Sequence, residues 1–115
     1  MSLRNKLYEQ IASDGNRIRL RFNPSHPIFE GHFPSNPIVP GACLVQIAEE
    51  ILSERLNRPI RFTTISNLKF HQPITPDMEV VYQLNENKIE IANPDLTAVY
   101  AQFKATYLCT DPDVQ

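Results

Sequence analysis

The alternation of apolar and polar residues predicts one half-buried strand early in the chain. In "RIRLRF", residues 17–22, isoleucine, leucine and phenylalanine alternate strictly with three arginines. Successive side chains of a strand point to opposite faces, so this segment buries one face and exposes the other. The preceding residues 5–12 show no clear period, and "SDGN" at 13–16 indicates a turn.

A proline-rich stretch then interrupts the pattern. Residues 23–40 contain five of the ten prolines in the chain. Proline fixes φ and removes a backbone donor, so the stretch is predicted to be a stiff loop without regular structure. Long loops inside small domains are usually functional or disordered, and the apolar residues within this one argue against disorder. We therefore expect residues 31–40 to be well ordered.

From Gly41 onward the spacing becomes helical. One stripe of the predicted helix carries Ala42, Val45, Gln46, Glu49 and Ser53. Nearly every remaining face is apolar: Cys43, Leu44, Ile47, Ala48, Ile51 and Leu52. A helix that is apolar over so much of its circumference is a buried one. It is predicted to span about residues 41–56 and to end before Pro59, which disfavours helical backbone at the residue before it.

Three strand-like segments follow the predicted helix. Residues 61–74, 79–93 and 96–110 are rich in β-branched and aromatic residues, and "TPDM" at 75–78 and "NEN" at 85–87 indicate turns. Strands on both sides of one buried helix predict an α+β fold. We expect a single domain over residues 1–115, with one antiparallel sheet of five or six strands wrapped around one long central helix.

Composition excludes several classes of function. The chain has 115 residues and a formal net charge of −2, and its 11 lysines and arginines are scattered. No nucleic-acid surface is therefore expected. The apolar runs are too short to span a bilayer and no signal sequence is evident, so we expect a cytoplasmic protein without membrane insertion. Two cysteines 66 residues apart and three dispersed histidines match no metal or redox spacing, and we expect no cofactor.

The most specific motif is "GHFPSNPIVPG" at residues 31–41, directly before the predicted helix, and a second block is "ISNLKFHQPITPDMEV" at 65–80. Together they resemble the hot-dog-fold dehydratases that act on 3-hydroxyacyl groups carried on acyl carrier protein. The resemblance covers roughly residues 17–108, and the short chain is most similar to compact members of aryl-polyene-type pathways.

The resemblance implies dehydration of a 3-hydroxyacyl thioester, on acyl carrier protein or CoA, to the trans-2-enoyl thioester. It also implies edge-to-edge pairing of two subunits into a homodimer, or a higher oligomer of dimers, with a heteromer containing a related subunit as the other possibility. In such a pair, His32 of one chain would face the helix of the other.

The chemistry gives His32 a role. Dehydration removes a C2 proton and protonates the departing C3 hydroxyl, and a neutral imidazole is a good base near pH 7. The enolate that forms could be stabilised by backbone N–H groups at the start of the helix. Gly41 would let a thioester approach closely because it has no side chain. Our candidate substrate-binding residues are Phe33, Pro40, Gly41 and Ala42.

The expected acid is replaced by an amide. The resembled dehydratases carry a carboxylate five residues after the glycine of Pro-Gly, and this chain has Gln46 there. An amide can orient water or a hydroxyl, but it cannot transfer a proton as a carboxyl does. The longer dehydratases of the resembled family often carry glutamate first and glutamine four residues later. This chain has Gln46 first and Glu50 one helical turn later on the same face, as if the pair were exchanged. The candidate catalytic residues are therefore His32, Gln46 and Glu50, whereas Glu49 is expected to be solvated.

Other residues and other functions remain open from the sequence. His26 is expected to be structural or at the surface, Cys43 to belong to the helix core, and His71 to occupy a variable position of the resembled family. A non-catalytic acyl-binding protein or partner subunit is the first alternative function. An acyl-thioester hydrolase is the second alternative and is ranked last. Such a hydrolase usually needs a carboxylate near the helix start, and Glu30 is the only acidic residue just before the motif. The fold alone does not choose among these functions.

Overall fold

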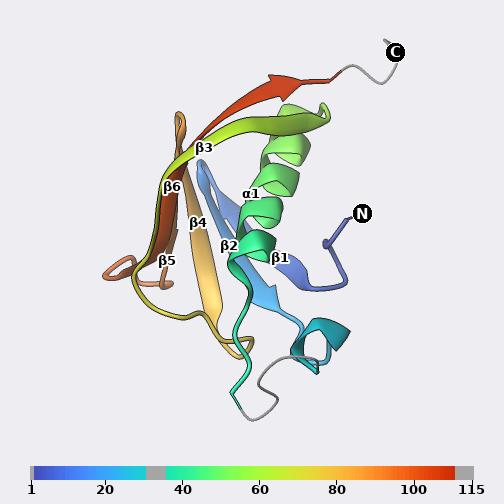
Figure 1. Cartoon of the computed structure of the whole chain (residues 1–115), viewed down its shortest axis with the longest axis vertical. Helices are drawn as coiled ribbons and strands as arrows, with labels where there is room; N and C mark the ends of the chain where they lie inside the picture. Colours follow the sequence, from blue (N-terminus) through green and yellow to red (C-terminus); the bar gives the residue numbers. More distant parts are fainter. Residues whose placement is uncertain (1, 31–35, 111–115) are drawn as a thin grey trace.

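The computed structural model describes residues 2–30 and 36–110. Within them the elements are β1 (Tyr8–Asp14), β2 (Arg17–Phe22), the 3₁₀ turn η1 (Pro27–Phe29), α1 (Gly41–Leu56), β3 (Ile60–Phe70), β4 (Glu79–Asn85), β5 (Lys88–Ala92) and β6 (Val99–Cys109). The strands form one antiparallel sheet in the order β1-β2-β4-β5-β6-β3. The sheet curls around α1 (Figure 1), so the predicted architecture is confirmed.

Several predicted boundaries agree with the structure. The helix spans residues 41–56 and the alternating strand spans 17–22, as predicted. The segment 79–93 divides into β4 and β5 at the predicted turn, where Glu86 has a φ of 56°. The segment 61–74 is shorter as a strand than predicted, because β3 ends at Phe70.

One element was not predicted from the sequence, and one expectation was wrong. The aperiodic start of the chain contains β1, an edge strand in which only Tyr8 is buried, so no alternation was visible. The proline-rich stretch contains the short turn η1, although we expected no regular structure there. The Nδ1 of His26 accepts a hydrogen bond of 3.0 Å from the Ile28 N–H and caps this turn, which gives His26 a structural role.

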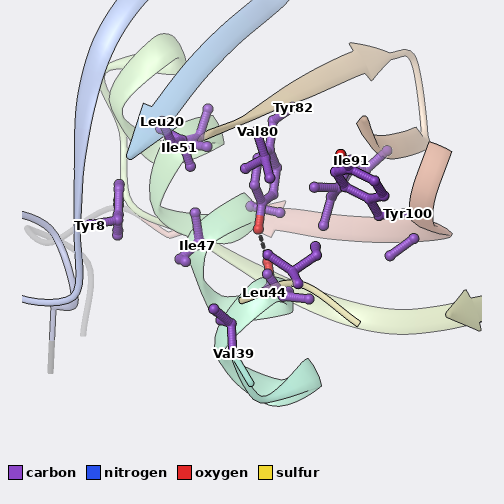
Figure 2. Packing of buried hydrophobic residues seen from close by; sticks show 14 of the residues in the cluster. Tyr8, Leu20, Val39, Leu44, Ile47, Ile51, Val80, Tyr82, Ile91 and Tyr100 are labelled. Atoms are coloured by element: carbon purple, nitrogen blue, oxygen red, sulfur yellow. Dashed lines mark hydrogen bonds between the residues drawn. The ribbon is translucent and has the colours of Figure 1, made fainter. Parts of the chain in front are cut away.

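The core lies between α1 and the concave face of the sheet (Figure 2). The helix contributes Leu44, Ile47, Ala48 and Ile51, and β2 contributes all three of its apolar residues. The expectation of a helix buried on nearly every face needs correction for the single chain. Ala42 is exposed, and Val45, Gln46 and Glu49 are half-buried, because the sheet covers only one side of α1.

Two contacts fix the helix start relative to the sheet. The hydroxyl of buried Tyr82, on β4, donates a 2.8 Å hydrogen bond to the Leu44 carbonyl (Figure 2). The N–H of buried Val39 donates to the Ile74 carbonyl at 2.8 Å, which holds the segment before α1 against the β3–β4 connection. The expected order of residues 31–40 stays a prediction, because residues 31–35 lie outside the described residues.

The two edges of the sheet differ in character. β1 forms one edge and β3 the other. β3 carries Ile65, Leu68 and Phe70 with 42%, 45% and 53% of their surface exposed. Unpaired edge strands with apolar side chains are sites of pairing with another chain.

Among the described residues no helix is long and apolar enough to cross a membrane.

We predict that Tyr82→Phe lowers the free energy of unfolding by about 1 kcal/mol, because it removes one buried hydrogen bond. Burial, and to a smaller extent the neighbouring Tyr8 and Cys43, raises the pKa of Tyr82 well above its usual value. The folded state therefore prefers the neutral phenol, and this stability is lost as the pH rises above about 10. Urea unfolding of both proteins from about pH 9 to 11 should show that the free energy of unfolding falls less steeply with pH in the variant than in the native protein. An equally steep fall of the free energy of unfolding in both proteins would contradict the role given to the Tyr82 phenol.

Candidate functional site

The start of α1 is not capped by a side chain. Pro40 is the N-cap residue, with φ −61° and ψ 143°, and it makes no side-chain cap hydrogen bond. The first turn contains no acidic residue. The first N–H groups of a helix lack intrahelical partners and carry partial positive charge. The positive end of α1 is therefore not neutralised by its own first turn.

An apolar hollow of about 300 Å³ opens beside this helix start. It is lined by Ile38, Val39, Gly41, Leu44, Phe70, His71, Gln72, Pro73 and Ile74. A Cβ built at Gly41 would lie 2.6 Å from the Phe70 Cζ, so the glycine lets the aromatic ring approach the helix. His71 is exposed at this hollow, and its backbone N–H donates to the Tyr100 carbonyl at 2.7 Å.

A second hollow, of about 460 Å³, lies on the opposite, outer side of α1. It is lined by Ser2, Ala42, Val45, Gln46, Glu49 and Glu50. Within one chain, candidate residues therefore line two separate hollows. Gly41 lines the first hollow, whereas Ala42 and Gln46 line the second. Pro40 is the helix N-cap and lines neither of these two hollows.

Gln46 and Glu50 lie together, as their spacing predicted. The Gln46 Nε2 donates a 3.0 Å hydrogen bond to the Glu50 Oε2. Among the described residues, the other partners of Glu50 come from the N-terminal segment, and no sequence pattern predicted them. Its carboxylate also accepts from the Leu3 N–H at 2.9 Å, the Arg4 N–H at 3.1 Å, the Tyr8 hydroxyl at 3.0 Å and the Ser2 hydroxyl at 3.3 Å.

The remaining candidates are placed as follows. Glu49 is not a solvated side chain as expected, because its Oε2 accepts a 2.8 Å hydrogen bond from the Phe62 N–H and ties α1 to β3. Glu30 is exposed, and its N–H closes η1 on the Pro27 carbonyl at 3.0 Å. Cys43 packs against the core, and burial raises its thiol pKa, which disfavours the nucleophilic thiolate.

His32 and Phe33 belong to residues 31–35, which lie outside the described part of the chain. Their proposed roles rest on the sequence motif. The described residues on either side, up to Glu30 and from Asn36, place the ends of this segment at η1 and at the approach to α1.

Known proteins share both the sequence pattern and the fold. Two relatives are named 3-hydroxyacyl-acyl-carrier-protein dehydratase FabZ. The one from Sulfurovum sp. is 35% identical over 74 residues, and the match covers 53% of this chain and 50% of the relative. The one from Rhizobium johnstonii is 34% identical over 87 residues, and the match covers 69% of this chain and 56% of the relative. The chain spans about half the length of the curated relatives it matches.

Solved structures support the same architecture. The dehydratase heterocomplex ApeI:P from Xenorhabdus doucetiae matches with a TM-score of 0.66 and 25% identity, over 90% of this chain and 94% of that one. The E. coli PaaI protein matches with a TM-score of 0.57 at 15% identity, over 90% of this chain and 80% of that one, which shows the hot-dog fold alone. A family model described as ApeI dehydratase matches residues 9–107. The resemblance read from the motifs is thus confirmed, and the chain belongs to the ApeI-like family of hot-dog-fold dehydratases.

Proposed function

We propose that the protein dehydrates a 3-hydroxyacyl thioester, carried on acyl carrier protein or CoA, to the trans-2-enoyl thioester and water. The observation that carries this proposal is the apolar hollow of about 300 Å³ beside a helix start that has no side-chain cap. Such a hollow suits an acyl group, and the helix N–H groups suit the negative charge of an enolate. The dehydratase family of the chain supports the same reaction.

In the proposed mechanism His32 removes the C2 proton, and the C–H electron pair forms an enolate on the thioester oxygen. N–H groups at the start of α1 stabilise that oxyanion. The enolate then collapses to the C2–C3 double bond as the C3–O bond breaks. The imidazolium returns its proton to the departing hydroxyl, which leaves as water.

Gln46 orients the C3 hydroxyl and does not protonate it, because an amide has no proton to give under these conditions. Glu50 is not assigned the role of proton donor either. Its carboxylate already accepts hydrogen bonds from Gln46 and from the N-terminal segment, and protonating it would disrupt that arrangement. These contacts favour assigning both proton transfers to His32.

We further propose that two copies pair along β3 into a homodimer with two equivalent sites. The exposed apolar residues of this edge strand support the pairing. The half-exposed outer side of α1, with Ala42 and Gln46, would then face His32 of the other copy. This arrangement would reunite candidate residues that line separate hollows in one chain.

The first test is the reaction itself. The purified protein should convert a 3-hydroxyacyl thioester into the enoyl thioester, and His32→Ala should lower kcat by about 10²-fold or more, because it removes the base. His26→Asn is the matched control, since asparagine can still cap η1 and the rate should not change. Release of a free acid would instead identify a hydrolase. Lack of any product would favour an acyl-binding role.

The second test restores a carboxyl at the expected position. Gln46→Glu should raise kcat about 10²-fold, because it supplies a proton donor of similar size. The neighbouring Glu50 carboxylate, within hydrogen-bonding distance, favours the protonated form of the introduced carboxyl. Gln83→Glu, on the outer face of β4 beside Arg17, is the control for the added charge and should not alter the rate. An unchanged or lower kcat in Gln46→Glu would remove position 46 from proton transfer.

The third test concerns the assembly. Ile65→Lys, on β3, should convert the dimer into a folded monomer and abolish dehydration, because it places a charge in the proposed interface. Ile11→Lys makes the same change on β1, the opposite edge, where Ile11 is 37% exposed. Sedimentation velocity should show that this control remains dimeric. A native protein that is monomeric at micromolar concentration would contradict the pairing.

A further inference from the structure

We propose that Glu50 is a positioning residue that acts on the substrate only through Gln46. In this proposal Glu50 is the centre of a polar cluster, formed with Ser2, Leu3, Arg4 and Tyr8, that we call the N-terminal clasp. The clasp holds the start of the chain on the outer side of α1 and fixes the orientation of the Gln46 amide. The role in catalysis rests on the proposed dehydratase function.

The hydrogen bonds of the carboxylate carry this proposal. The Oε2 atom of Glu50 accepts from the Gln46 Nε2 and from the Leu3 N–H. The Oε1 atom accepts from the Arg4 N–H, the Tyr8 hydroxyl and the Ser2 hydroxyl. An ionised carboxylate offers about four lone-pair positions. The chain's own donors therefore use the hydrogen-bonding capacity of Glu50, as expected for a fixed acceptor rather than for a group that delivers a proton.

Tyr8 keeps its donor role over the working pH range. Its side chain is buried, and burial together with the charge of Glu50 and their hydrogen bond raises its pKa far above the usual value. The phenol therefore remains protonated, and its hydroxyl must donate because an ionised carboxylate only accepts. This bond holds Glu50 at the position from which it can reach Gln46.

The direction of the Gln46 bond has a chemical consequence. Since Glu50 can only accept, the Gln46 group that faces it must be the NH₂ group. The carbonyl Oε1 lies on the other branch of the amide carbon, so it is directed away from Glu50. An oxygen acceptor in that position suits the O–H of a substrate hydroxyl. Without Glu50 the NH₂ group would lose this acceptor.

Packing supports the clasp from the other side. Leu7 is buried in the core, so the segment that follows residues 2–4 has an anchor besides its bonds to Glu50. Arg4 also forms an ion pair with Glu54, one turn further along α1. Both partners of this pair are well exposed, and such pairs contribute little. Glu54 is therefore a suitable control, because it contacts the same segment without contacting Gln46.

The kinetic test is a double-mutant cycle. Glu50→Gln should lower kcat about tenfold and leave KM within about twofold, because the orientation of the hydroxyl matters in the transition state. Both limbs of the pH–rate profile of Glu50→Gln should lie at the same pH values as in the native protein. In a Gln46→Leu background the same change at position 50 should alter kcat by less than about twofold, since the amide is already gone. Glu54→Gln should retain the native kcat.

Three results would overturn the positioning role. An unchanged kcat in Glu50→Gln would show that the orientation of Gln46 does not depend on Glu50. Loss of a limb of the pH–rate profile would make Glu50 a general acid. An equal fall of kcat in the native and Gln46→Leu backgrounds would reduce Glu50 to a structural residue.

A spectroscopic measurement tests the clasp without using activity. The side-chain amide protons of Gln46, assigned by ¹⁵N NMR, should exchange slowly in the native protein and at least about tenfold faster in Glu50→Gln, with an intermediate effect in Tyr8→Phe. Fast exchange in the native protein would refute the clasp whatever the activity. Slow exchange in a protein without dehydratase activity would leave the clasp intact and refute both the proposed function and the positioning role of Glu50 in catalysis.

Discussion

The packing of α1 against the concave face of the sheet is the constraint on which the other features depend. Leu44, Ile47 and Ile51 are buried on the sheet side, and the Tyr82 hydroxyl bonds to the Leu44 carbonyl. These contacts fix both the rotation of the helix about its axis and the position of its first turn. Gly41 is thereby directed toward the hollow beside β3, and Gln46 toward the opposite side.

The polar side of α1 is organised as well, because its carboxylates bind backbone N–H groups of neighbouring segments. Glu49 accepts from Phe62 on β3, and Glu50 accepts from Leu3 and Arg4. Buried or half-buried backbone donors need partners, and charged acceptors form stronger bonds than neutral ones. Two adjacent glutamates thus attach the helix to segments that are distant in the sequence, one on each flank.

Local periodicity explains which parts of this arrangement the sequence could predict. The alternation in β2, the helix boundaries and the i, i+4 proximity of Gln46 and Glu50 all depend on residues close in the chain. β1 and the partners of Glu49 and Glu50 could not be predicted in this way. The bonds from the N-terminal segment to Glu50 join residues 42 to 48 positions apart, and β1 has only one buried residue to mark it.

The exchange of glutamine and glutamate then has an electrostatic explanation. A carboxylate at position 46 would lie within hydrogen-bonding distance of Glu50, and two ionised groups so close repel each other. A chain that uses Glu50 to hold its N-terminal segment must keep that group charged, since it accepts from two backbone N–H groups. A neutral amide at position 46 relieves the repulsion and adds a donor to the same carboxylate. The pair therefore retains one negative charge, now at the position that binds the N-terminal segment rather than at the position that faces the proposed substrate.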